Sequence, residues 1–252
     1  MEVPLMPKKL TRQQLTAHLE SLQRAGVEQL PRAKSGASTR ANGGEAPQAE
    51  AAADTASAGS GPTGDELPHN LELLAQVVST CPRCPELAAT RTHTVFGNGD
   101  PNARLVFLGE APGADEDRSG IPFVGRAGQL LNKIIEACRL SREDVFVLNV
   151  IKCRPPSNRN PLPEEAANCR PYLDRQLELI KPEFICCLGA VAAQNLLGTA
   201  ETIGKLRGRL HDYRGIKVVC TYHPAYLLRN PAAKADTWED MKMLMRQMGV
   251  EL

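Results

Sequence analysis

From about Asn70 onward, short apolar runs alternate with stretches in which apolar residues recur at helical spacing. Four runs have the length and composition of buried strands, at 104–108, 145–150, 184–188 and 217–222. Helical periodicity covers 128–140, 163–180 and 190–197, and a last stretch with the lone Trp238 follows the fourth run. This alternation is typical of parallel βαβ units. It predicts an α/β fold with a four-stranded, mostly parallel sheet and helices on both faces.

The first 68 residues show a different pattern. Residues 11–26 predict a short amphipathic helix, with Thr11 and Gln14 spaced as a capping box. Such a helix could dock an unknown protein partner, or lie in solvent or against its own chain. Residues 33–68 are rich in Ala, Gly, Ser and Pro and lack aromatic side chains, so too little apolar surface offsets the entropy of ordering. We expect an N-terminal segment over 1–32, a disordered linker over 33–68 and one folded domain over 69–252.

Polar residues directly follow three of the predicted strands. The first strand runs into Gly109-Glu110-Ala111-Pro112-Gly113, the second ends at Asn149, and the fourth is followed by His223. In open α/β sheets, ligands bind at the carboxyl ends of the strands. A carboxylate, an amide and an imidazole are therefore expected to meet at one edge of the sheet, the alternative being that each serves the core independently.

The eight cysteines fall into two groups. Cys81 and Cys84 form a C-P-R-C pair, and Cys153 and Cys169 are 16 positions apart. Four thiolates suit zinc or iron–sulfur, and the second spacing is too wide for half of a zinc ribbon, which favours a [4Fe–4S] cluster. Zinc and simple burial remain alternatives. The other four lie in apolar strand or helix segments and are expected in the core; they are Cys138, Cys186, Cys187 and Cys220.

Composition limits the location and the partners. Lys and Arg total 30 against 29 for Asp and Glu, so any surface for a polyanion must be local. No apolar run reaches the ~18 residues of a membrane span, and the first residues lack the apolar core of a signal peptide. We expect a cytoplasmic protein without membrane contact, in a prokaryotic cytosol or nucleoid, and a monomer by default.

Three long motifs resemble the family 4 uracil-DNA glycosylases. They are GEAPGADEDRSGIPFVGRAGQLLN (109–132), LNVIKCRPP (148–156) and HPAYLLRNP (223–231), in the same chain as the four spaced cysteines. The resemblance covers about 71–248 and implies a three-layer α/β/α fold. It also implies an enzyme that flips uracil out of single- or double-stranded DNA and hydrolyses its N-glycosidic bond, which leaves an abasic site and starts base excision repair. The same resemblance implies a structural [4Fe–4S] cluster held by Cys81, Cys84, Cys153 and Cys169.

The resemblance also assigns roles in the substrate pocket. Phe123 should stack on the flipped uracil, Asn149 should bind its O4 and N3 edge, and His223 should face O2. Residue chemistry agrees, because an amide can donate to O4 and accept from N3–H, whereas cytosine presents the opposite pattern. Gly109, Ala111 and Gly113 are expected to line the pocket. The best-known branch of the superfamily carries its water-activating Asp at the position that matches Ala111.

Without that Asp, another carboxylate must position the water. Glu110 is our first choice and Glu116 the second, with Asp115 and Asp117 nearby. Alternatively, Glu116 shapes the pocket around C5 and helps to exclude the methyl group of thymine.

The segment after His223 is expected to contact DNA. Leu227 or Leu228 would be the wedge that fills the gap left by the flipped base, flanked by Arg229. Phosphate contacts are expected from cations in loops at the same edge: Lys152, Arg154, Arg159, Lys205, Arg207 and Arg229.

Two alternatives remain open, and a third, covalent trapping, is disfavoured, so we expect turnover. A sister branch traps uracil covalently with a histidine in a KRRIH-type loop, and no such loop occurs between Lys152 and Cys169. A relaxed glycosylase would also act on hypoxanthine or xanthine. A non-enzymatic module that binds nucleic acid through a cluster or zinc would use the same cysteines.

Overall fold

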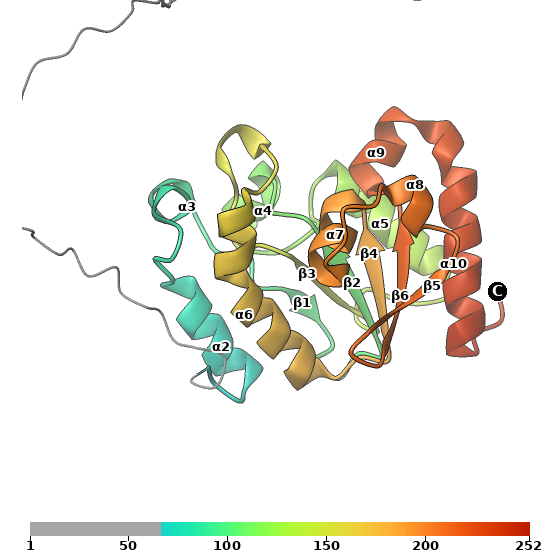
Figure 1. Cartoon of the computed structure of the whole chain (residues 1–252), viewed down its shortest axis with the longest axis horizontal. Coiled ribbons are helices and arrows are strands. Elements are labelled where there is room, and N and C mark those ends of the chain that lie inside the picture. Colours follow the sequence, from blue (N-terminus) through green and yellow to red (C-terminus); the bar gives the residue numbers. More distant parts are fainter. Residues whose placement is uncertain (1–66) are drawn as a thin grey trace, which may run out of the picture. The chain divides into compact units, whose positions relative to one another are not determined.

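A computed structural model describes residues 67–252 of the chain (Figure 1). The helix expected over 11–26 and nearly all of the linker expected over 33–68 lie outside the described residues. Within the described part, no helix is both long and apolar enough to cross a membrane.

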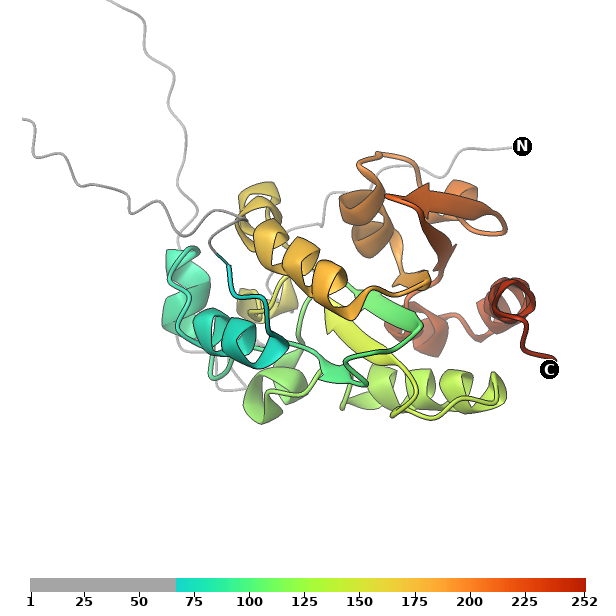
Figure 2. The ribbon, with the colours of Figure 1, turned by 90° about the horizontal axis from the view of Figure 1, so that it is seen from below.

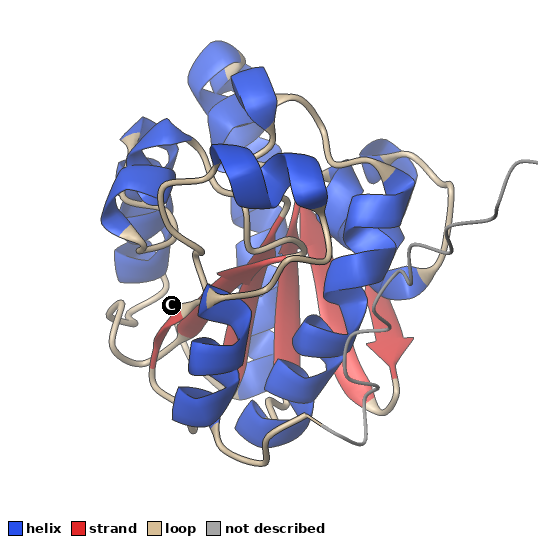
Figure 3. Cartoon of the chain, turned by 90° about the vertical axis from the view of Figure 1, so that its left-hand side faces the viewer, coloured by secondary structure: helices blue, strands red, loops and turns tan. Residues whose placement is uncertain are grey.

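The domain is built on a six-stranded sheet with the strand order β1-β3-β2-β4-β6-β5. Figure 3 shows the sheet with helices around it. The strands are β1 (Asn98–Gly99), β2 (Leu105–Gly109), β3 (Phe146–Asn149), β4 (Phe184–Leu188), β5 (Leu210–Tyr213) and β6 (Ile216–Thr221). The four central strands are parallel, as predicted. The expected number of strands was wrong, because β1 and β5 pair antiparallel at the two edges. Neither edge strand contains a buried residue, so neither stands out as an apolar run.

Helices connect the strands and cover both faces. They are α2 (Leu71–Ser79), α3 (Pro85–Thr90), α4 (Ala114–Ser119), α5 (Arg126–Ala137), α6 (Pro163–Ile180), α7 (Ala190–Leu197), α8 (Ile203–Leu206), α9 (Pro224–Arg229) and α10 (Lys234–Met248), with 3₁₀ turns η2 (Pro156–Asn158) and η3 (Pro231–Ala233). The expected ranges of α6 and α7 are confirmed, and Trp238 lies in α10.

The alternation of side chains along the strands produces the three layers. Leu105 and Phe107 of β2 pack in a core with α5 and α10, whereas Val106 and Leu108 pack with α6 and α7 on the other face. Figure 2 shows α6 and α5 on opposite sides of the sheet. Because both faces are buried, the central strands read as continuous apolar runs. The predicted α/β/α architecture is confirmed.

The order of the strands fixes where a ligand site can form. The chain passes from β2 to β3 on one side and then returns to β4 on the other side of β2. Crevices form at such switch points, outside the carboxyl ends of the strands. Gly109 at the end of β2 pairs with Asn149 at the end of β3, so the segments that follow both strands begin side by side.

Candidate active site

A cavity of about 450 Å³ opens at this edge of the sheet. Its lining comes from the segments after β2, β3 and β6 and includes Glu110, Ala111, Gly113, Glu116, Phe123, Asn149, His223, Tyr226 and Arg229. The structure therefore brings the carboxylate, the amide and the imidazole to one cavity. Its volume lies within the range of about 300–1,000 Å³ that is usual for small-molecule pockets.

Gly109 leaves room for Asn149 and Phe123 to pack together at the base of this cavity. A Cβ at this position would overlap the Asn149 Oδ1 atom and would lie 2.6 Å from Cζ of Phe123. No larger residue fits without displacing both side chains. Gly109 thus contributes by the space it leaves, although it does not line the cavity itself.

Phe123 is held in an unusual backbone conformation. Its φ is 56°, in the left-handed region that phenylalanine rarely adopts, and its side chain is 8% exposed. Gly128 makes this possible, because a Cβ there would overlap the backbone of Phe123. Such conformations persist only where the surroundings impose them, and they gather at functional sites. The ring of Phe123 lies 5.7 Å from that of His223, centroid to centroid.

Asn149 carries a buried acceptor without a partner. The residue is 1% exposed, and among the described residues its Oδ1 atom has no hydrogen-bond partner. An unsatisfied buried polar atom costs about 1–3 kcal/mol. Since buried polar groups are nearly always hydrogen-bonded, this atom is suited to a ligand that donates to it.

His223 is a neutral hydrogen-bond donor. Its Nδ1 accepts a hydrogen bond of 3.1 Å from the backbone N–H of Ala225, at the start of α9. In a neutral ring the proton must then lie on Nε2. Burial, with a smaller contribution from the positive charge of Arg229, lowers the pKa of His223 to about 4. At neutral pH the ring therefore offers an Nε2–H donor without a positive charge.

The two candidate carboxylates have different surroundings. Glu116 accepts hydrogen bonds from the backbone N–H groups of Gly113, Val124 and Gly125, at 3.1, 2.9 and 3.0 Å. Its oxygens thereby tie the start of α4 to the loop that carries Phe123. Glu110 has no hydrogen bond or ion pair from its side chain within 67–252, and burial raises the pKa of its carboxyl group. These surroundings favour Glu110 for binding a water and Glu116 for holding the loop.

The other two acids near this loop are engaged elsewhere. Asp115 pairs with Arg118 within α4. Asp117 is 3% exposed and accepts the backbone N–H of Thr92 with both oxygens. Neither lines the cavity.

Only one of the two proposed wedge residues is exposed. Leu227 is 1% exposed on the buried side of α9, so its assignment to DNA contact was wrong. Leu228 is 38% exposed and follows Tyr226, which lines the cavity and stacks on Tyr222 at 5.0 Å. An apolar side chain can enter a base stack only if it is exposed, and Leu228 meets this condition.

Three of the six cations proposed for phosphate contact are committed to the protein itself. Lys152 is 1% exposed and donates to the backbone oxygen of Asn149 at 2.7 Å. Arg207 pairs with the buried carboxylate of Asp240, and Arg159 bridges Glu86 and Glu165. The predicted phosphate contact of Lys152 was wrong, because the surrounding protein encloses its side chain.

The remaining cations are more accessible. Arg154 is half-buried and donates to Oδ1 of Asn158 at 2.7 Å. Lys205 and Arg229 have no ion-pair partner in the described part of the chain, and Arg229 lines the cavity. Arg229 is thus placed to meet an anion at the mouth of the cavity.

The four spaced cysteines lie at one end of the domain. Cys81 follows α2, Cys84 precedes α3, Cys153 follows β3 and Cys169 lies in α6. Arg91 connects two of them, because its Nη1 donates to the backbone oxygen of Cys81 at 2.9 Å and to Sγ of Cys153 at 3.2 Å.

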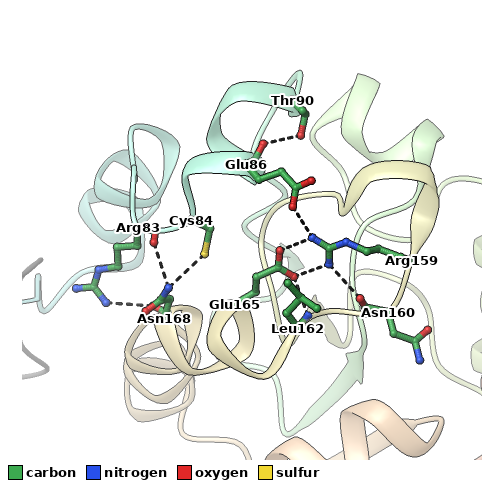
Figure 4. A network of polar contacts seen from close by, with 9 residues as sticks. All are labelled: Arg83, Cys84, Glu86, Thr90, Arg159, Asn160, Leu162, Glu165 and Asn168. Atoms are coloured by element: carbon green, nitrogen blue, oxygen red, sulfur yellow. Dashed lines mark hydrogen bonds and ion pairs between the residues drawn. The ribbon is translucent and has the colours of Figure 1, made fainter. Parts of the chain in front are cut away.

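Asn168 and Arg159 join the segments that carry these cysteines (Figure 4). The Nδ2 of Asn168 donates to the backbone oxygen of Arg83 at 3.1 Å and lies 3.7 Å from Sγ of Cys84. Arg159 bonds Glu86 of α3 and Glu165 of α6. The helices on both sides of the cysteines are therefore held together by polar contacts.

The thiols are close enough to affect one another. Burial raises the pKa of Cys153, Arg91 lowers it through its charge and hydrogen bond, and the charges of Cys81 and Cys84 raise it by a smaller amount. Burial also raises the pKa of Cys169. The charge and the backbone N–H of Lys152 lower it, and Cys153 and Cys81 raise it by a smaller amount. Within residues 67–252, no three His, Cys, Asp or Glu side chains are grouped tightly enough to hold a single metal ion.

The remaining cysteines lie in the core, as predicted. Each is 0% exposed, and they are Cys138, Cys186, Cys187 and Cys220.

Comparisons with known proteins agree with this geometry. Residues 96–242 match the model of the uracil DNA glycosylase superfamily. The chain is 47% identical to the type-4 uracil-DNA glycosylase of Thermotoga maritima over 170 residues, which cover 67% of this chain and 86% of that protein. It is 42% identical to the type-4 enzyme of Archaeoglobus fulgidus over 183 residues, 69% of this chain and 92% of the relative. The chain belongs to the type-4 uracil-DNA glycosylases. A type-5 uracil-DNA glycosylase of Pyrobaculum aerophilum is less similar, at 31% identity over 179 residues, 58% of this chain and 79% of that protein.

Sequence reasoning missed two features of this type-4 site. Gly128, which makes room for the backbone of Phe123, looked like an ordinary helix residue. Lys152 looked like a surface cation, although its place between Asn149 and Cys153, both of them candidate site residues, was a signal that it is enclosed.

The state of His223 can be measured directly. We predict that nitrogen and carbon NMR shifts of this ring show the Nε2–H tautomer at pH 7, with ionisation centred at about pH 4. The reason is that protonation would place a charge in a buried position. A midpoint for His223 near ~6.5, the ordinary value for histidine, or a proton on Nδ1, would contradict this description of the site.

Proposed function

We propose that the cavity binds a uracil flipped out of DNA and that its residues hydrolyse the bond between N1 of the base and C1′ of the sugar. The observation that carries the proposal is the buried, unpartnered Oδ1 of Asn149, which lies beside the rings of Phe123 and His223 in a type-4 uracil-DNA glycosylase. Uracil-DNA glycosylase activity in base excision repair follows from the family.

Phe123 and Asn149 would replace what the base loses when it leaves the helix. Unstacking and unpairing cost a few kcal/mol, and an aromatic face with hydrogen bonds to the base edge can return this energy. Oδ1 of Asn149 would accept from N3–H of uracil, and Nδ2 would donate to O4. Cytosine carries an amino group at C4 and a bare N3, so donor would face donor and acceptor would face acceptor. An Asn149 fixed in this orientation would therefore reject cytosine.

His223 would stabilise the departing base. As the C1′–N1 bond breaks, its electron pair moves into the uracil ring, and negative charge gathers on O2 and N1. The Nε2–H of His223 would donate to O2, which is worth about 3–4 kcal/mol for a donor aimed at a developing oxyanion. A neutral ring suits this role because no charge has to be buried before the reaction.

Glu110 would direct the water. Its carboxylate has no other partner in the described part of the chain and lines the cavity. It would hold a water on the side of C1′ opposite to the base and take one proton as the oxygen bonds to C1′. The products are free uracil and an abasic site.

The four spaced cysteines would hold a [4Fe–4S] cluster. The fit rests on Lys152, which is fully buried yet has no carboxylate within ion-pair distance among residues 67–252. A buried ammonium needs an anionic neighbour, and thiolates are the only candidates that affect it. Since each thiolate of such a cluster binds a different iron, the four need not enclose one ion. When bound, the cluster would supply structural cross-linking between α2, α3, α6 and the segment after β3.

Leu228, Arg229 and Arg154 would contact the DNA around the flipped nucleotide. Leu228 would fill the gap in the stack, and the two arginines would bind backbone phosphates. These contacts carry no base information, so recognition of uracil would rest on the cavity.

Release of free uracil from a uracil-containing oligonucleotide tests the function. The wild-type protein, purified without oxygen, should release uracil, and Asn149→Ala and His223→Ala should each be slower by ~100-fold or more, as is typical when a transition-state donor is removed. His69→Ala and Asn102→Ala are matched controls at exposed positions and should match the wild type. Absence of release by a folded, iron-loaded wild-type protein would overturn the proposed function.

The cluster is tested by metal content. Alanine at Cys81, Cys84, Cys153 or Cys169 should lower the iron content from four atoms per chain and should remove the broad visible absorbance of a [4Fe–4S] group. Cys138→Ala makes the same change at a core cysteine and should keep the iron. Equal iron loss in the control, or zinc in place of iron in the wild-type protein, would contradict the assignment.

A further inference from the structure

Lys152 takes part in neither the proposed binding of uracil nor the proposed cleavage of its glycosidic bond, so its buried position needs another explanation. It is 1% exposed, and its Nζ donates to the backbone oxygen of Asn149 at 2.7 Å. No carboxylate lies within ion-pair distance of it in the described part of the chain. A lysine is almost never fully buried unless an anion accompanies it.

The negative partners of Lys152 are sulfurs. Cys153 is the next residue in the chain, and the backbone N–H of Lys152 bonds the sulfur of Cys169. Burial lowers the pKa of Lys152 to about 8, and the charges of Cys169 and Cys153 act in the opposite direction. Lys152 therefore stands between the cysteines on one side and Asn149 on the other.

The backbone around Lys152 is fixed at several points. The N–H groups of Val150 and Ile151 donate to the oxygens of Gly109 and Glu110, at 3.0 and 3.2 Å, and Val95 donates to the oxygen of Lys152 at 2.7 Å. The oxygen of Asn149 accepts from the Nζ of Lys152 at 2.7 Å. The peptide between Asn149 and Val150 is therefore held at both of its polar groups, at the N–H by Gly109 and at the oxygen by the ammonium group.

We propose that Lys152 is a positioning residue that couples the cysteine site to uracil recognition: its charge helps to balance the thiolates of Cys153 and Cys169, and its hydrogen bond helps to hold the Asn149 peptide. The proposal rests on the proposed function of the cavity. A bound cluster keeps the ammonium group in place. Without it, a buried cation would have no anionic partner and would leave for water, and Asn149 would lose its support while the sheet stays intact.

The test uses the full-length chain with Lys152→Met and Lys152→Arg, and with Lys133→Met as the matched control. Lys133 is exposed on α5 and undergoes the same chemical change. Three quantities are measured: the rate at which the visible absorbance bleaches in air, the affinity for free uracil, and the affinity for uracil-free DNA.

Lys152→Met should bleach faster and should bind uracil about 10-fold more weakly, as expected when a buried acceptor loses its partner. Its affinity for uracil-free DNA should stay within about 2-fold of the wild type. Lys152→Arg should restore the bleaching rate, because it keeps the charge, and Lys133→Met should match the wild type throughout.

Two results would overturn the proposal. One is a Lys152→Met variant with wild-type affinity for uracil. The other is a loss of affinity for uracil-free DNA as large as that for uracil, which would mean general structural damage. If Lys152→Met does not fold, Lys152→Gln, which is polar and similar in size, is subjected to the same measurements and decides. A wild type that holds iron without releasing uracil would refute the proposed function, whereas the bleaching rates would still test the charge balance.

Discussion

The meeting of Asn149 and Phe123 over Gly109 is the contact on which the rest of the site depends. The parallel register places Gly109 beside Asn149 at the switch point of the sheet, and the missing Cβ leaves room for both side chains. Phe123 reaches this point only through a left-handed backbone conformation. Gly128 makes room for that conformation, and the carboxylate of Glu116 holds the residues that follow it. The cavity is thus shaped by backbone constraints, and its few polar groups can remain unpaired until a base enters.

Burial gives each ionisable group of the site a different state. It keeps His223 neutral at pH 7 and raises the pKa of Glu110, and both side chains line the same cavity. It also lowers the pKa of the enclosed Lys152, against the charges of Cys169 and Cys153. The segment 149–153 therefore joins two regions that look separate in the sequence: the pocket, through Asn149, and the cysteines, through Cys153. The end of the domain that carries the cysteines thus helps to hold Asn149 in place.

Much of this architecture could be predicted from the chain. The central strands could be recognised as apolar runs because they are buried on both faces. The meeting of the segments after β2, β3 and β6 could be predicted because parallel strands end at the same edge of the sheet. The edge strands could not be found, because Asn98–Gly99 is too short and Leu210–Tyr213 is half exposed. Leu227 and Leu228 are identical in type, and only packing against α5 and α10 shows which is buried. In the same way, Lys152 and Arg229 are both cations that follow strands of the sheet. They differ in exposure, which depends on segments far away in sequence.

The most direct measurement is an experimental structure of the iron-loaded protein with free uracil bound. This account predicts the base against the ring of Phe123, with Oδ1 of Asn149 within hydrogen-bond distance of N3, Nδ2 near O4 and Nε2 of His223 near O2. The Nζ of Lys152 should still bond the oxygen of Asn149. Uracil bound elsewhere, or bound in this cavity with Asn149 turned away from its N3 edge, would contradict the central claim that this amide reads the base.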